Sequence, residues 1–124
     1  MSEKDILIVD DEVDLREIFA GILEREGYIV DLAGTAAEAK GLLAAHQYGM
    51  VLVDWRLPDG DGAVIANLAA EVGSQAFVMS GYLRRMPPGN VDPRQTIMKP
   101  IRPAELLAMV RACIGAAPTR KENS

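Results

Sequence analysis

The sequence lacks a second cysteine, a long apolar run and an excess of positive charge. Cys113 stands alone, so no disulfide can form within the chain, which suits a reducing compartment. No apolar run approaches the roughly 18 residues that a membrane-spanning helix requires, and the first residues, MSEKD, contain no signal-peptide core. The net charge of −5 argues against general binding to nucleic acid. We therefore expect a cytoplasmic protein that contacts neither membranes nor nucleic acid directly.

The chain has the length and composition of one domain. Its 124 residues, of which 49% are hydrophobic and 25% charged, are typical of a globular protein. The sequence shows no internal repeat and no low-complexity tract. We expect residues 4–116 to form the domain and residues 117–124 to form a flexible C-terminal tail.

Short apolar runs alternate with segments of helical periodicity. Runs that are apolar throughout suit strands buried on both faces, as in a parallel sheet. The expected strands are Ile6–Val9, Tyr28–Ala33, Met50–Val53, Ala76–Met79 and Ile97–Met98. The expected helices are Val13–Glu26, one opened by a capping box at Thr35–Glu38, Ala63–Val72 and one that starts at Pro103. This alternation predicts an α/β fold, a doubly wound parallel sheet with helices on both faces.

Apolar residues at helical spacing predict which helix faces are buried. In the first expected helix they are Leu15, Ile18, Phe19, Ile22 and Leu23, and in the third they are Val64, Ile65, Leu68 and Val72. The fourth crossover lacks such a pattern, because Pro87, Pro88 and Pro93 forbid a long regular helix. We expect this crossover to be short, irregular and mobile.

Polar residues follow four of the five expected strands. They are Asp10 and Asp11, Asp54, Ser80 and Lys99. The carboxyl ends of parallel strands share one edge, where ligands bind in open α/β sheets. Three carboxylates in one place repel each other unless a cation neutralises them, and magnesium favours hard oxygen ligands. A carboxylate beside magnesium can accept a phosphoryl group.

The same residues carry a family resemblance. From Asp5 to about Ala116 the chain resembles the receiver domain of two-component response regulators, of the stand-alone type. The matching features are Asp10-Asp11, Asp54, Ser80, Lys99-Pro100 and the loop Asp54-x-x-x-Pro58-x-x-Asp61-Gly62. The resemblance implies a flavodoxin-like (βα)5 fold with strand order 2-1-3-4-5. It also implies a signalling switch rather than an enzyme that turns over substrate.

The resemblance further implies a role for each matching residue. Asp54 is the phosphoacceptor, and Asp11, Asp54 and the main-chain carbonyl of Arg56 bind Mg²⁺, which Asp10 binds through water. Lys99 contacts the phosphoryl group, Ser80 moves to bond it, and the Lys99–Pro100 peptide bond is cis. The implied donor is a histidine kinase or a histidine phosphotransfer protein. Output then passes to another protein by contact, by onward phosphotransfer or through a further domain.

Two positions depart from the family pattern. Thr96 stands where family members usually carry an aromatic residue that moves with the hydroxyl residue, and the fourth crossover is shortened. We therefore expect the segment Gly81–Pro93 to respond to phosphorylation. Arg56 and Tyr82, two positions after Asp54 and Ser80, are expected to tune the phosphoryl lifetime at the rim of the site.

Two other functions stay open. A magnesium-dependent phosphatase also forms an aspartyl phosphate, but such enzymes commonly carry a second acid where Arg56 stands here. A binding module that works without phosphorylation would be expected to have lost part of the acidic cluster. The segment Asp59–Gly62 resembles the start of a calcium loop, but position 70 is alanine and not the required glutamate, so we interpret it as a turn.

Overall fold

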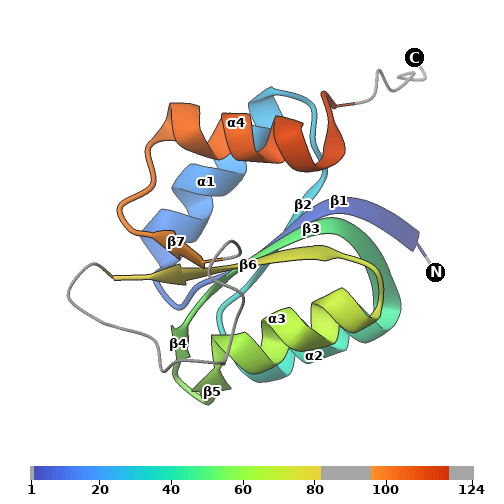
Figure 1. Cartoon of the computed structure of the whole chain (residues 1–124), viewed down its shortest axis with the longest axis vertical. Helices are drawn as coiled ribbons and strands as arrows, with labels where there is room; N and C mark the ends of the chain where they lie inside the picture. The colour runs from blue at the N-terminus through green and yellow to red at the C-terminus, as the bar shows by residue number, and fades with distance from the viewer. Residues whose placement is uncertain (1, 82–95, 118–124) are drawn as a thin grey trace.

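The computed structural model describes residues 2–81 and 96–117, in which strands alternate with helices as predicted, except for two short strands after Asp54 (Figure 1). In chain order the elements are β1 (Ser2–Val9), α1 (Val13–Arg25), β2 (Val30–Ala33), α2 (Ala36–Ala45), β3 (His46–Asp54), β4 (Arg56–Leu57), β5 (Gly60–Asp61), α3 (Gly62–Glu71), β6 (Gln75–Ser80), β7 (Thr96–Met98) and α4 (Pro103–Ile114).

Five parallel strands form the central sheet, in the order β2-β1-β3-β6-β7. This order confirms the predicted 2-1-3-4-5 arrangement. Helices α1 and α4 cover one face of the sheet, and α2 and α3 cover the other (Figure 1). The predicted shortened fourth helix falls within 82–95 and lies outside the described residues, as does nearly all of the segment expected to respond to phosphorylation.

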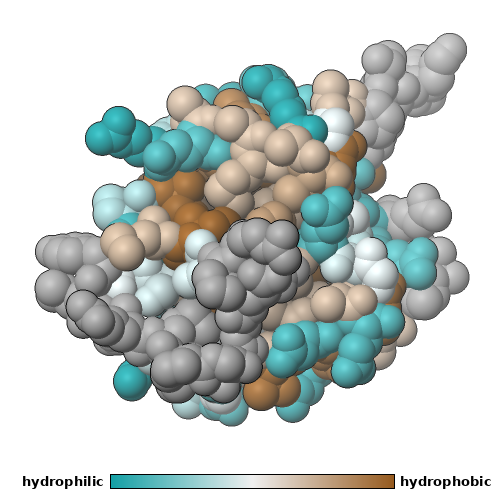
Figure 2. Space-filling view, in the orientation of Figure 1, coloured by the Kyte–Doolittle hydropathy of each residue, from teal (hydrophilic) through white to brown (hydrophobic). Residues whose placement is uncertain are grey.

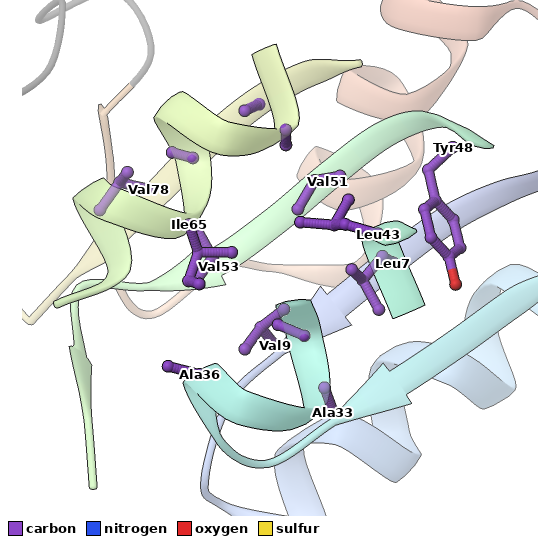
Figure 3. Close-up of a cluster of buried hydrophobic side chains, with 14 of the residues drawn as sticks. Leu7, Val9, Ala33, Ala36, Leu43, Tyr48, Val51, Val53, Ile65 and Val78 are labelled. Atoms are coloured by element: carbon purple, nitrogen blue, oxygen red, sulfur yellow. The ribbon is translucent and has the colours of Figure 1, made fainter. Parts of the chain in front are cut away.

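Successive residues of the central strands enter two separate hydrophobic cores. In β3, Val51 and Val53 face the core beneath α2 and α3, where Figure 3 shows them with Leu7, Val9 and Ile65. Met50 and Leu52 face the core beneath α1 and α4, together with Phe19, Leu23, Leu106 and Val110. Burial on both faces explains why the strand sequence is apolar without alternation.

The helix ends follow local sequence signals. The Thr35 hydroxyl accepts a hydrogen bond from the Glu38 amide and so caps α2 (3.1 Å). The Glu38 carboxylate accepts from the Gly34 amide rather than from that of Thr35, so the predicted capping box is displaced by one residue (2.7 Å). Gly27 ends α1 with a φ of 99°, which glycine adopts without strain. Pro103 occupies the first turn of α4, as predicted.

The predicted helix faces were too wide at their flanks. Ile18 is 57% exposed, Val64 is 54% exposed and Val72 is 43% exposed. The prediction that these three side chains are buried is therefore wrong. In α1 the buried residues are Phe19, Ala20 and Leu23. Ile18 directly precedes Phe19 in the sequence and lies beside this buried face, not within it. Each helix contacts the sheet along one narrow stripe, which helical spacing alone does not delimit.

The described surface mixes apolar and charged side chains. Figure 2 shows hydrophobic residues gathered over α4 and the strands beside it, with hydrophilic residues mostly at the margins of this face. Within the described residues, every helix is too short or too polar to cross a bilayer.

Candidate functional site

The polar strand ends meet at one edge of the sheet. Val9 of β1 pairs with Val53 of β3, so Asp10 and Asp54 follow neighbouring positions of adjacent strands. Ser80 ends β6, and its carbonyl accepts a hydrogen bond from the Lys99 amide just after β7 (2.8 Å). Residues far apart in the sequence thus converge because the parallel register aligns the ends of four strands.

The three aspartates form a compact group of oxygen ligands. Asp10, Asp11 and Asp54 each offer one carboxylate oxygen, and these atoms all lie within 4.8 Å of one another. Asp10 is fully buried, Asp54 is half-buried and Asp11 is exposed, so the group opens toward solvent on the side of Asp11. The Asp10 Oδ1 atom accepts a hydrogen bond from the Glu12 amide, which orients this carboxylate (3.0 Å).

Lys99 supplies a cation to this group. Its Nζ atom lies 3.0 Å from Asp10 Oδ2, 3.5 Å from Asp54 Oδ2 and 3.8 Å from Glu12 Oε1. Burial lowers the pKa of Lys99, but the hydrogen bond to Asp10 and the surrounding carboxylates outweigh that effect and raise it. Lys99 therefore stays charged beside Asp54 at neutral pH.

The ammonium of Lys99 offsets the neighbouring carboxylates at Asp54 but does not offset burial. Burial raises the pKa of Asp54 above its ordinary value, and the charges of Asp10 and Asp11 add to this rise, against the opposing charge of Lys99. Ionisation of Asp54 is therefore less favourable in the folded protein than for an ordinary aspartate. A hard divalent cation would favour the ionised form of Asp54, and the donor set of carboxylate oxygens fits one.

The other predicted site residues lie around this group. Ser80 is buried, and its hydroxyl donates to the Gly81 carbonyl (3.3 Å). Arg56 begins β4, two residues after Asp54, and its guanidinium lies 5.3 Å from the centre of the Trp55 ring. Thr96 is half-buried in β7 and pairs with Val78 of β6. The Lys99–Pro100 peptide bond is cis. Tyr82 lies outside the described residues.

Sequence reasoning missed the hairpin that follows Asp54. Strands β4 and β5 pair antiparallel, and the loop that contains them is closed by a hydrogen bond from the Gly62 amide to the Trp55 carbonyl (2.6 Å). The predicted turn at Asp59–Gly62 is only partly correct, because the turn residues are Pro58 and Asp59, while Gly60–Asp61 form β5 and Gly62 starts α3. Strands of two residues carry no periodicity by which the sequence could reveal them. The contact of Glu12 with Lys99 was also missed, although Glu12 directly follows the acidic pair.

Comparison with known proteins gives the family. The model of the response regulator receiver domain matches residues 6–111. The transcriptional regulatory protein PmrA of Pectobacterium parmentieri is 35% identical over 114 residues, which cover 88% of this chain and 51% of that protein. The chain spans about half the length of the first curated relatives it matches.

Solved structures agree with this assignment. A CheY-like receiver domain protein from Methanospirillum hungatei JF-1 superposes with a TM-score of 0.77 at 31% identity, covering 90% of this chain and 93% of that one. A response regulator protein from Burkholderia pseudomallei shares the fold, with a TM-score of 0.70 at 23% identity over 86% of this chain and 66% of that one. That structure contains a phosphorylated aspartic acid, a calcium ion and citrate. The chain therefore belongs to the response regulator receiver domain family, whose members are signalling modules rather than classical enzymes.

Proposed function

We propose that this protein is a phosphorylation switch in which Asp54 accepts a phosphoryl group. The observation that carries the proposal is the convergence of Asp10, Asp11 and Lys99 on the carboxylate of Asp54 at the carboxyl edge of the sheet. The phosphorylated aspartic acid in the Burkholderia pseudomallei relative supports it by analogy of fold.

For the transfer of the phosphoryl group, the protein has to position the Asp54 carboxylate and to supply positive charge beside it. An oxygen of the ionised Asp54 attacks phosphorus and forms an acyl phosphate. The bond from phosphorus to the donor's imidazole nitrogen breaks, and its electron pair stays on the leaving imidazole. Lys99 lies next to Asp54 and would hold negative charge that develops on the phosphoryl oxygens.

The proposed ligands of Mg²⁺ are Asp11, Asp54 and the main-chain carbonyl of Arg56. Asp10 would bind the ion through a water molecule. When bound, the ion supplies positive charge that offsets the carboxylates and the phosphoryl oxygens. Asp10 also keeps Lys99 in place, since its Oδ2 atom accepts a hydrogen bond from the ammonium. The calcium ion in the Burkholderia pseudomallei structure is consistent with an oxygen-rich cation site in this fold.

The proposed donor is a phosphohistidine of a histidine kinase or of a histidine phosphotransfer protein, and the output is contact with another protein or onward transfer. The proposal includes a cytoplasmic location, which is usual for receiver domains. Ser80 would move toward the phosphoryl group. Thr96 is too small to fill the space that an aromatic residue fills in other family members. Its hydroxyl could only exchange a hydrogen bond, which is worth about 0.5–1.5 kcal/mol net.

Arg56 and Tyr82 are proposed to tune the phosphoryl lifetime. The Arg56 side chain is exposed and stacks on Trp55, beside the backbone that leaves Asp54. From this position it can admit or block the attacking water. The rate of phosphate loss from the Arg56→Ala variant, compared with that from the natural sequence, measures this role.

The central test is phosphorylation by a small acyl phosphate donor with Mg²⁺, followed by intact mass. We expect one added phosphoryl group on the natural sequence, none without Mg²⁺ and none on Asp54→Asn, because an amide cannot form the acyl phosphate. Glu71→Gln, which removes an exposed carboxylate at the end of α3, serves as the control and should be phosphorylated normally.

Two outcomes would count against the proposal. Full phosphorylation of Asp54→Asn would exclude Asp54 as the acceptor. Failure of the natural sequence to take up phosphate under any donor and Mg²⁺ concentration would favour a binding module that works without phosphorylation.

A further inference from the structure

The hairpin that follows Asp54 is attached to the start of α2 by a single carboxylate. Asp59, at the tip of this hairpin, accepts a hydrogen bond from the Ala36 amide at Oδ1 (2.6 Å) and from the Ala37 amide at Oδ2 (3.0 Å). Amides in the first turn of a helix have no partner within the helix. Asp59 thus satisfies two of them from a position 22 to 23 residues further along the chain.

Two apolar contacts reinforce this attachment. Leu57 of β4 is buried in the same core as Ala36. Gly60 packs so closely that a Cβ atom placed there would lie 3.3 Å from the Ala36 Cβ atom. The tip of the hairpin therefore rests on the first turn of α2 through a charged group and through its backbone.

The base of the hairpin is held at a different place. The Trp55 amide donates to the Met79 carbonyl of β6 (2.8 Å), and the Gly62 amide donates to the Trp55 carbonyl (2.6 Å). Arg56 lies between this base and the tip, where it pairs with Asp61. The position of the Arg56 backbone therefore depends on both ends of the hairpin.

We propose that Asp59 is a positioning residue for the phosphorylation site: by fixing the hairpin tip to α2, it holds the main-chain carbonyl of Arg56 in place and strengthens Mg²⁺ binding. The inference rests on the proposed function, because it assigns that carbonyl to the cation. The two amides lower the pKa of Asp59, so this carboxylate is ionised at neutral pH.

Two simpler explanations of Asp59 are separable by experiment. Asp59 could matter only because it stabilises α2, or only because its negative charge attracts a cation at long range. Thr35→Ala also weakens the start of α2, since it removes the hydrogen bond to the Glu38 amide, but it leaves the hairpin attached. Asp59→Asn removes the charge but keeps one acceptor oxygen for the amides.

The experiment is a Mg²⁺ titration of the natural sequence, Asp59→Ala, Asp59→Asn and Thr35→Ala. Fluorescence of Trp55, the single tryptophan, reports binding next to the site, and thermal unfolding gives a second measure of the same Kd. We expect Asp59→Ala to raise the Kd about tenfold, as for residues that orient metal ligands. Asp59→Asn should raise it less, and Thr35→Ala should leave it unchanged.

Each alternative result has a distinct meaning. Equal weakening in Asp59→Ala and Asp59→Asn would show a charge effect and overturn the inference. Weakening of the same size in Thr35→Ala would show that α2 stability is responsible, and an unchanged Kd in both Asp59 variants would also overturn it. If Asp59→Ala does not fold, the Kd of Asp59→Asn can still be compared with that of Thr35→Ala.

Failure of the proposed function gives a different pattern. In that case Asp54→Asn would still be phosphorylated, or the natural sequence would take up no phosphate, whatever the Asp59 variants do. If the natural sequence takes up phosphate with Mg²⁺ and the Asp59 variants need no more of the ion, only the inference about Asp59 fails.

Discussion

Tyr48 shows how one buried hydroxyl can make stability depend on pH. The residue is buried, and its hydroxyl donates a 2.6 Å hydrogen bond to Asp31 Oδ2. Burial raises the pKa of Tyr48, and the hydrogen bond to Asp31 and the charge of Asp31 raise it further. An unfolded tyrosine ionises near pH 10. The stabilisation is thus complete below about pH 10 and is lost as the pH rises above it.

We predict that Tyr48→Phe lowers the free energy of unfolding at neutral pH by about 1–2 kcal/mol, because the hydrogen bond to Asp31 is lost. The variant should also lose stability less steeply than the natural sequence above about pH 10. Urea unfolding between about pH 7 and 11 measures both effects. An identical alkaline slope in the two proteins would show that Tyr48 ionises no later in the folded state than in the unfolded chain.

At the scale of elements, the entry into α3 depends on a glycine. A Cβ atom on Gly62 would overlap the Asp54 carbonyl oxygen and would lie 2.8 Å from the Asp54 carbonyl carbon. Gly62 is buried, so the backbone around Asp54 would have to shift to make room. The end of β3 and the start of α3 therefore approach each other only where the side chain is missing.

We predict that Gly62→Ala lowers the free energy of unfolding by about 1–3 kcal/mol, as overpacking does, and slows phosphorylation of Asp54. Gly41→Ala is the matched control, since Gly41 lies in the exposed part of α2 with nothing within 4 Å of an added Cβ atom. That change should stabilise the protein by about 1 kcal/mol. Urea unfolding and phosphorylation rates of both variants test this prediction. Equal free energies of unfolding and equal rates in the two variants would contradict the predicted overlap.

The elements also show what the sequence could and could not predict. The buried strands and the acidic residues at their ends were predictable, because a strand covered on both faces is apolar throughout and parallel strands end at one edge. Strand β3 starts at His46 rather than at Met50, because His46–Tyr48 pair with Ser2–Lys4 outside the apolar run. The partner of Asp59 was not predictable, since its contact with α2 depends on how distant segments pack.

At the scale of the whole molecule, we expect stability and cation binding to be coupled through the site. Burial, with a smaller contribution from the neighbouring carboxylates, disfavours the ionised form of Asp54, and this cost is carried by the folded protein alone. A ligand that binds only the folded protein stabilises it in proportion to RT ln(1 + [L]/Kd). The site should therefore weaken the protein without Mg²⁺ and strengthen it with Mg²⁺.

We predict that Asp54→Asn raises the Tm of the protein in a chelator, because it removes a charge that burial disfavours in the folded state. The same variant should lose most of the rise in Tm that Mg²⁺ gives to the natural sequence. Thermal unfolding of both proteins, with chelator and with increasing Mg²⁺, tests the two effects together. A lower Tm for Asp54→Asn in chelator would mean that the contact of Asp54 with Lys99 outweighs the cost of burying the charge of Asp54.

The position of Lys99 in the chain also determines when its ion pair can form during translation. Lys99 follows its partner Asp10 by 89 positions, whereas the acidic residues lie just after β1 and at the end of β3, which are translated earlier. Helix α4 comes later still, and the Gly115 carbonyl beyond it accepts a hydrogen bond from the Tyr28 hydroxyl (2.7 Å). On the ribosome, the carboxylates emerge before the lysine that offsets them. The ion pair between Lys99 and Asp10 can therefore form only after the chain has been translated through Lys99, long after both acidic strand ends have left the ribosome.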